Sequence, residues 1–159
     1  MTTSDARAAA VQKARALLAA ESAGVLSTIS VHRAGFPYGS VTPYALSARG
    51  APLLLLSRLA AHTKNLLADA RASLFVGDRS AAEDPQAGAR ISLLGRVAPL
   101  PAGQDDETDA RARYLVVWPR AADYLALGDF SFWRLDVEEA RLIAGFGEIR
   151  WLDGKNLSG

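Results

Sequence analysis

The sequence predicts a mainly β (α+β) fold, in which six to seven antiparallel strands close into a barrel with flanking short helices. Two observations and one physical argument support this prediction. After Gly24, apolar residues recur with a period of two along much of the chain, which is typical of half-buried strands. Short turns separate the first three of these segments, which favours antiparallel hairpins over parallel crossovers. Closing such a sheet into a barrel removes exposed strand edges.

The first element is predicted to be a helix. Ser4 and Asp5 can cap its start, and apolar residues follow at helical spacing to about Ala23. Gly24 is predicted to end this helix, because glycine adopts the left-handed conformation at little cost. The strands predicted after it cover residues 25–30, 38–46, 53–57, 73–76, 90–100, 130–136, 140–144 and 146–152.

Further helices are predicted over residues 63–69, 105–117 and 120–127. Pro43 interrupts the second strand and must lie at a bulge or an unpaired edge, because proline has no N–H to donate. The polar segment 78–89, which contains glycine and proline, is predicted to be a mobile loop. Residues 153–159 are predicted to be a frayed tail.

Composition narrows the function classes. A chain of 159 residues with 50% hydrophobic residues fits a single domain, predicted over residues 1–159. The net charge of only +1 argues against a nucleic-acid partner. The absence of cysteine excludes disulfides and thiolate metal ligands, and no metal site is predicted. No apolar run or leader pattern indicates a membrane partner or secretion, so a cytoplasmic location is predicted.

The segment with the clearest chemical potential is the junction between the strand ending at Ser57 and the helix predicted from Thr63. Free N–H groups at a helix start, together with the helix dipole, favour an anion such as phosphate. Ser57 and Thr63 offer hydroxyl groups, while Arg58 and Lys64 offer positive charge. Lys64 is one of three lysines in a chain that otherwise uses arginine. The alternative interpretation is that Thr63 merely caps the helix and that Lys64 is solvated.

Several segments together resemble the pyridoxamine 5'-phosphate oxidase-like split-barrel superfamily, which binds flavin mononucleotide (FMN), and most of all its heme-utilisation branch. The segments are GVLSTIS at 24–30, GFPYGSVTPY at 35–44, LLLLS at 53–57, HTKNL at 62–66, RISLLGR at 90–96 and GFGEIRWL at 145–152. Their order and spacing, rather than any single motif, carry the resemblance, which extends over roughly residues 10–152.

The resemblance implies a split β-barrel that forms a homodimer, with cofactor sites for a small-molecule ligand at the interface. It places Ser57, Arg58, Thr63 and Lys64 around the FMN phosphate, with His62 and Asn65 in the same loop and helix start. It also implies contacts along the flavin ring and ribityl chain from the strand residues Ser40, Val41 and Thr42, and weaker contacts near the ring from Arg90 and Trp151.

The chain departs from this branch in one respect. Members often carry an additional small C-terminal domain that can supply a heme-ligating histidine, whereas this sequence holds only His32 and His62. An axial ligand would have to be one of these or a tyrosine. His32 is expected to be solvated in a turn, and His62 to hydrogen-bond the loop or a phosphate.

The function expected from these observations is that of an FMN-binding protein. The resemblance implies a flavin-dependent oxidoreductase, and the sequence identifies neither its substrate nor its catalytic residues. A heme- or tetrapyrrole-binding protein without flavin, on the same barrel, is the alternative. A purely structural barrel with an empty groove is the third class.

Overall fold

The computed structural model describes residues 3–145 and 147–158. Its helices are α1 (Thr3–Ala20), α2 (Ala61–Ala68), α3 (Asp105–Val117), α4 (Ala121–Ala126) and α5 (Gly154–Leu157), with a short 3₁₀ helix, η1, at Arg79–Ala81. Its strands are β1 (Ala23–Ile29), β2 (Pro37–Leu46), β3 (Pro52–Ser57), β4 (Arg71–Gly77), β5 (Arg90–Pro99), β6 (Phe130–Ile143) and β7 (Ile149–Asp153).

The strands form one antiparallel sheet in the order β3-β2-β1-β4-β5-β6-β7, and an additional β3–β6 pairing closes it into a barrel. Six strands lie in the closed ring, and β7 extends the sheet beyond β6. The closing ladder runs from Leu53 opposite Arg134 to Ser57 opposite Phe130. The predicted antiparallel barrel with short flanking helices is therefore confirmed.

Two hydrophobic cores lie on either side of β3. Leu54 and Leu56 point into the barrel, where they pack with residues from the other strands and from α1. Leu53 and Leu55 point outward and pack beneath α3 and α4. Because successive side chains of a strand face opposite sides, a strand covered on both sides reads as a continuous apolar run. That is the LLLL segment of β3.

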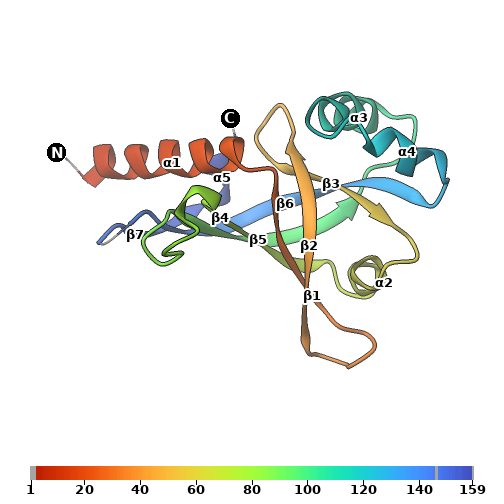
Figure 1. Ribbon diagram of the computed structural model, residues 1–159, viewed down its shortest axis with the longest axis horizontal. Helices are drawn as coiled ribbons and strands as arrows, with labels where there is room; N and C mark the ends of the chain where they lie inside the picture. Colours follow the sequence, from red (N-terminus) through yellow and green to blue (C-terminus); the bar gives the residue numbers. More distant parts are fainter. Residues whose placement is uncertain (1–2, 146, 159) are drawn as a thin grey trace.

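The helices divide between the two ends of the barrel (Figure 1). Helices α1 and α5 lie at the end where both chain termini are found, while α2, α3 and α4 lie at the other end. The hairpin that joins β1 to β2 projects beyond the rest of the molecule. None of the helices in the described residues is long and apolar enough to span a membrane.

The first helix ends at Ala20, earlier than predicted, and Gly24 lies within β1 instead of capping the helix. The reason is steric. A Cβ atom on Gly24 would lie 2.5 Å from the carbonyl oxygen of Phe75 on the neighbouring strand β4. Glycine is used here for the close approach of two strands, which a sequence pattern cannot distinguish from a helix end.

The two strands predicted over 130–136 and 140–144 are a single strand, β6. The polar residues between them interrupt the apolar pattern because the β5–β6 register shifts between Leu94 and Gly95, which pair with Glu139 and Val137. The extra residue at such a bulge shifts the alternation of side chains without ending the strand. Pro43 is not at an unpaired edge, since it pairs with Ala23 of β1. It lies one residue before the β2–β3 ladder begins at Tyr44, so its missing N–H disrupts no pair with β3.

The end of the described chain is ordered, in contrast to the predicted frayed tail. Strand β7 ends at Asp153, whose side chain accepts a hydrogen bond from the Lys155 N–H and so caps α5. Leu157 of α5 is buried in the barrel core, and the side chain of Arg15 donates to the carbonyl oxygen of Asn156 at 2.9 Å. These contacts fasten the segment to α1.

Candidate functional site

The junction between β3 and α2 has the geometry of an anion site. Helix α2 begins at Ala61, two residues before the predicted start at Thr63, so that Thr63 lies in the first turn and does not cap the helix. The capping residue is Ala60, which makes no side-chain capping bond. The N–H groups of the first turn therefore point out of the N-terminal end of the helix, which is the positively polarised end of its dipole.

Two cations flank this helix start. The side chains of Arg58 and Lys64 are exposed, and within residues 3–145 and 147–158 neither forms an ion pair. The sequence contains no aspartate or glutamate between Glu21 and Asp69. An acid that the fold brings to this junction, Asp129, accepts a hydrogen bond from Ser57. Unpaired cations beside a helix N-terminus gain nothing from the dipole, so their placement favours an external anion.

The other residues predicted for this junction differ in whether their polar groups already have hydrogen-bond partners. The Ser57 hydroxyl donates to a carboxylate oxygen of Asp129 at 2.5 Å, so its proton is already used. Asn65 is buried and structural, since its amide nitrogen donates to the Thr28 hydroxyl at 2.9 Å. The Thr63 hydroxyl oxygen is buried and lacks a hydrogen-bond partner among the described residues.

His62 connects the junction to strand β2. Its Nδ1 lies 3.1 Å from the hydroxyl oxygen of Ser40. Burial lowers the pKa of His62 below its ordinary value of 6.5, which favours the neutral imidazole. Next to Ser40, the Val41 side chain is 77% exposed while Thr42 is buried, so the strand presents alternate residues to the outside and to the barrel.

This lowered pKa predicts a pH dependence of stability. The unfolded chain takes up a proton on His62 at a higher pH than the folded protein does. The contribution of neutral His62 to the free energy of unfolding is therefore fully present above pH 6.5 and is lost as the pH falls through the folded pKa. We expect the free energy of unfolding of His62→Gln, measured with urea at a series of pH values, to fall less steeply below pH 6.5. Equal slopes for both proteins would contradict a buried neutral histidine.

Arg90 and Trp151 lie away from this junction within one chain. Arg90 pairs with Gly77 at the end of β4 that is distant from α2, and its side chain donates to the Gln86 carbonyl oxygen at 2.7 Å. Trp151 lies on β7, at the opposite end of the molecule from α2 (Figure 1). A single chain thus does not bring these two residues to the predicted phosphate site.

An aromatic pocket of about 470 Å³ adjoins the junction and was missed at the level of sequence. Phe130, which forms one wall of this pocket, pairs with Ser57 in the ladder that closes the barrel. The remaining lining residues come from β2, β3, α3, α4 and the turn between the two helices: Pro43, Leu55, Tyr114, Trp118, Arg120, Ala121 and Tyr124. A pocket of this size, mostly apolar with few polar groups, is typical of small-molecule sites.

Hydrogen bonds and ring contacts fix the walls of this pocket. The indole N–H of Trp118 donates to the Tyr44 carbonyl oxygen at 3.0 Å, and the rings of Tyr124 and Phe130 lie 5.5 Å apart. Burial raises the pKa of Tyr114 to about 12, so its phenol is neutral. Arg120 is the only charged residue that lines the pocket within the described chain. The one local feature of the sequence that could have indicated this pocket is the WP dipeptide at residues 118–119, between α3 and α4.

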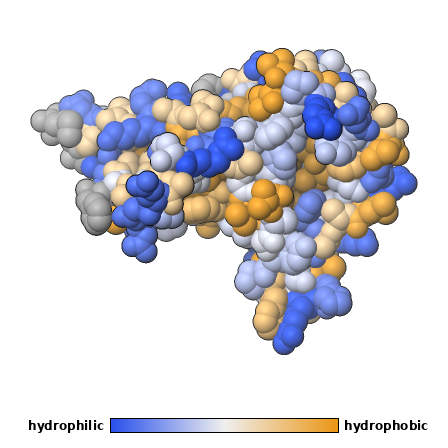
Figure 2. Space-filling model, viewed as in Figure 1, coloured by the Kyte–Doolittle hydropathy of each residue, from blue (hydrophilic) through white to orange (hydrophobic). Residues whose placement is uncertain are grey.

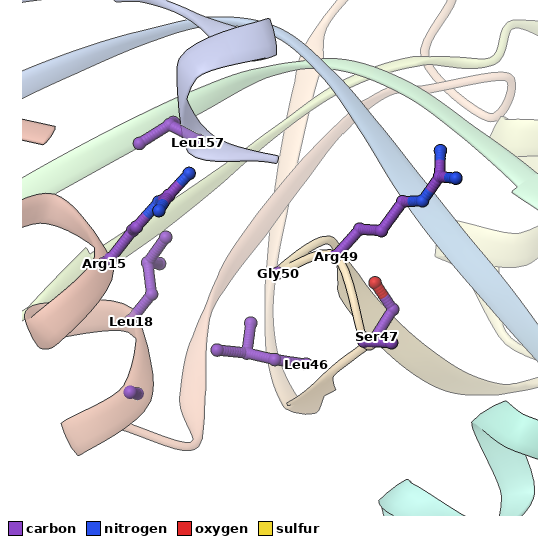
Figure 3. A pocket seen from close by; sticks show the side chains of 9 residues that line it. Arg15, Leu18, Leu46, Ser47, Arg49, Gly50 and Leu157 are labelled. Carbon is purple, nitrogen blue, oxygen red and sulfur yellow. The ribbon is translucent and has the colours of Figure 1, made fainter. Parts of the chain in front are cut away.

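A second cavity, of about 270 Å³, lies between α1, α5 and the hairpin joining β2 to β3 (Figure 3). The Arg15 side chain points toward Leu157, whereas that of Arg49 points away from Arg15. The Arg15 side chain in this cavity donates a hydrogen bond to α5, so we assign it a role in holding α1 and α5 together. We therefore place the candidate site at the junction and the aromatic pocket.

The outer face of the sheet carries a row of exposed apolar side chains that begins beside this site. Val41, Val25 and Phe75 are direct cross-strand neighbours on β2, β1 and β4. They are 77%, 37% and 42% exposed. Figure 2 shows an apolar patch over β1 and β2 in the middle of the visible face. The same row continues through Ser92 and Arg141 to Trp151.

Comparison with known proteins extends over nearly the whole chain. A family model described as "CREG, beta-barrel" matches residues 5–157. The chloroplastic non-canonical heme oxygenase HOZ of Arabidopsis thaliana is 37% identical over 142 residues, which are 88% of this chain and 42% of that protein. The chain thus spans less than half the length of this relative.

Two solved structures illustrate the range of similarity. A heme binding protein from Mycobacterium smegmatis superimposes with a TM-score of 0.85 at 34% identity, over 93% of this chain and 59% of that one. A Clostridium acetobutylicum protein of the pyridoxinephosphate oxidase family gives a TM-score of 0.68 at 13% identity, over 94% of this chain and 98% of the other. The second likeness concerns the fold alone.

Proposed function

Because the chain belongs to the CREG β-barrel family, we propose that it binds a tetrapyrrole such as heme at the β3–α2 junction and the adjoining aromatic pocket. The observation that carries this proposal is the pairing of unpartnered cations with an apolar pocket of about 470 Å³. A tetrapyrrole requires both, since its carboxylates need charge-assisted donors while its flat macrocycle needs apolar contact. The heme-related relatives named above support the same choice.

The residues present fit such a ligand. Arg58, Lys64 and the uncapped start of α2 would hold carboxylates, and the pocket aromatics would contact the macrocycle. His62 would offer a neutral imidazole, the protonation state in which histidine ligates metal. When bound, heme would supply iron redox chemistry; the protein would orient the ring and limit its contact with water.

FMN is a second candidate for the same junction, and one observation favours it. The start of α2 offers N–H groups beside the buried Thr63 hydroxyl, which lacks a partner among the described residues. A phosphate has enough acceptor oxygens to satisfy several such donors at once. In this case the protein would be a flavin-dependent oxidoreductase whose substrate would occupy the aromatic pocket.

We further propose that two copies of the chain pair through the apolar row on the outer sheet face. Val41 starts this row next to Ser40, which contacts His62, and Trp151 ends it on β7. A two-fold axis near the middle of the row would bring the start of one row toward the end of the other. The dimer would thereby close the site and bring Trp151 near it, as an isologous interface requires.

Changing Phe75 to glutamate should convert such a dimer into a monomer, because two like charges would then face each other near the axis. Sedimentation velocity at micromolar concentration measures the outcome. Val116→Glu serves as the control, since Val116 is an exposed apolar residue of α3 that lies outside this row. A wild-type chain that is monomeric at this concentration would refute the interface.

Titration of the purified chain with hemin and with FMN tests the cofactor. We expect hemin to bind with a Soret band and to be displaced poorly by FMN. Arg120→Gln and Tyr124→Ala should weaken hemin binding if the macrocycle lies in the pocket. Tight FMN binding without hemin affinity would favour the flavin candidate. No binding of either would leave a structural barrel with an empty groove.

A further inference from the structure

Strand β7 leaves one edge of the sheet free. It pairs with β6, and no other described strand lies beside it in the sheet. The Ala144 N–H donates to the Glu148 carbonyl oxygen at 2.9 Å, which identifies these two residues as a hydrogen-bonded pair. Since bonded pairs alternate along an antiparallel ladder, Arg150 and Leu152 also bond to β6. The N–H and C=O groups of Ile149 and Trp151 therefore face outward.

Two of the side chains on one side of this edge strand are apolar and exposed. The side chains of Ile149 and Trp151 are each 52% exposed on one side of the strand. On the other side, α1 and α5 pack against the sheet, with Leu152 buried in the barrel core. An exposed edge with apolar side chains is a template for a further strand.

Positive charge surrounds the same edge. Arg7 of α1 joins Ile149, Arg150 and Trp151 in lining a pocket of about 410 Å³ that contains no acidic side chain. The Nε of Arg150 is buried without a hydrogen-bond partner in the described chain, and neither arginine forms an ion pair there. The nearby acids are used elsewhere, because Glu148 pairs with Lys13 and Asp153 caps α5.

We propose that β7 binds an extended acidic peptide segment of a partner protein as an eighth strand. Backbone groups of the peptide would bond to Ile149 and Trp151. Alternate side chains of a strand face opposite sides, so one set would reach Arg7 and Arg150. The other set would lie beside Ile149, because Trp151 is turned toward the partner chain in the dimer proposed above. The preferred sequence therefore alternates acidic and apolar residues. A second copy of β7 suits the edge less well, because it would bring two copies of Arg150 together.

The probe is a capped, fluorescein-labelled hexapeptide of alternating valine and glutamate, added to the full chain and followed by anisotropy. We expect saturable binding below roughly 1 mM. A peptide with lysine in place of glutamate should not bind. The Arg7→Gln, Arg150→Gln double variant should weaken binding about tenfold, as expected for charge-assisted contacts.

The backbone contribution is tested with Ile149→Pro, which removes an outward N–H at the first residue of the strand, where proline is tolerated. Its control is Ile149→Val, which keeps the N–H. We expect at least about tenfold weaker binding for the proline variant and little change for valine. Circular dichroism melting checks that both fold. If the proline variant does not fold, a probe N-methylated at alternate amides replaces it and should not bind. Equal binding of the N-methylated probe, or no binding at 1 mM, would overturn the proposal.

Discussion

Replacing Lys64 with alanine is expected to weaken hemin or FMN binding about ten- to a hundredfold, while the melting temperature of the ligand-free protein stays level or rises slightly. A charge-assisted hydrogen bond to an anion contributes about 1.5–3 kcal/mol, which corresponds to this range of affinity. Lys64 lies in the first turn of α2, where the helix dipole disfavours a cation. Its removal therefore costs the folded protein little.

Two measurements on the same variant separate the interpretations: ligand titration and thermal melting without ligand. Lys155→Ala is the matched control, since it removes an exposed lysine on α5 at the other end of the molecule. Unchanged affinity of Lys64→Ala would place the anion elsewhere. A large loss of stability without ligand would mean that Lys64 has a structural role.

Changing Gly95 to alanine should lower the free energy of unfolding by about 3 kcal/mol or more. A Cβ atom on Gly95 would lie 2.1 Å from the Asp136 carbonyl oxygen and 3.1 Å from the Cα of Val137. Both atoms belong to the backbone of β6 at the bulge, so neither can move without disturbing the β5–β6 ladder. For a chain of this size the melting temperature should fall by roughly 6–12 °C.

Gly77→Ala is the control for this substitution. Its Cβ would meet only side-chain atoms of Phe75, the nearest at 3.6 Å, which is ordinary van der Waals contact. Urea unfolding of both variants measures the difference. If Gly95→Ala were as stable as Gly77→Ala, the close approach of the two strands at the bulge would not exist in solution.

Much of the fold could be predicted because its signals are local. The period-two pattern located β1, β2, β4 and β5, a continuous apolar run located β3, and short turns indicated antiparallel pairing. The resemblance to the pyridoxamine 5'-phosphate oxidase-like barrels and their heme branch is confirmed by the family model and by the solved structures. The β3–α2 junction was also located correctly, since a strand that ends in serine and arginine before a helix is a contiguous motif.

The remaining features depend on contacts distant in sequence. Because β6 continues through the bulge opposite Gly95, the two strands predicted there are one strand. The segment predicted as a frayed tail is ordered because Leu157 is buried in the barrel core. The hydrogen bonds of Ser57 and Asn65 could not be predicted for the same reason. Their partners, Asp129 and Thr28, lie far from them in the chain. The aromatic pocket likewise gathers residues from six segments, so apart from the WP dipeptide no local pattern indicated it.

The pairing of β3 with β6 has a consequence for how the chain folds. It joins residues as distant in sequence as Leu53 and Arg134, whereas the β1–β2 hairpin joins near neighbours. Bringing distant segments together costs loop-closure entropy before the new contacts repay it, so ring closure belongs among the late and slow steps. Until then the four leucines of β3 lack their final partner strand. A refolding chain is most vulnerable to self-association in that interval, and dilution would make encounters between such chains less frequent.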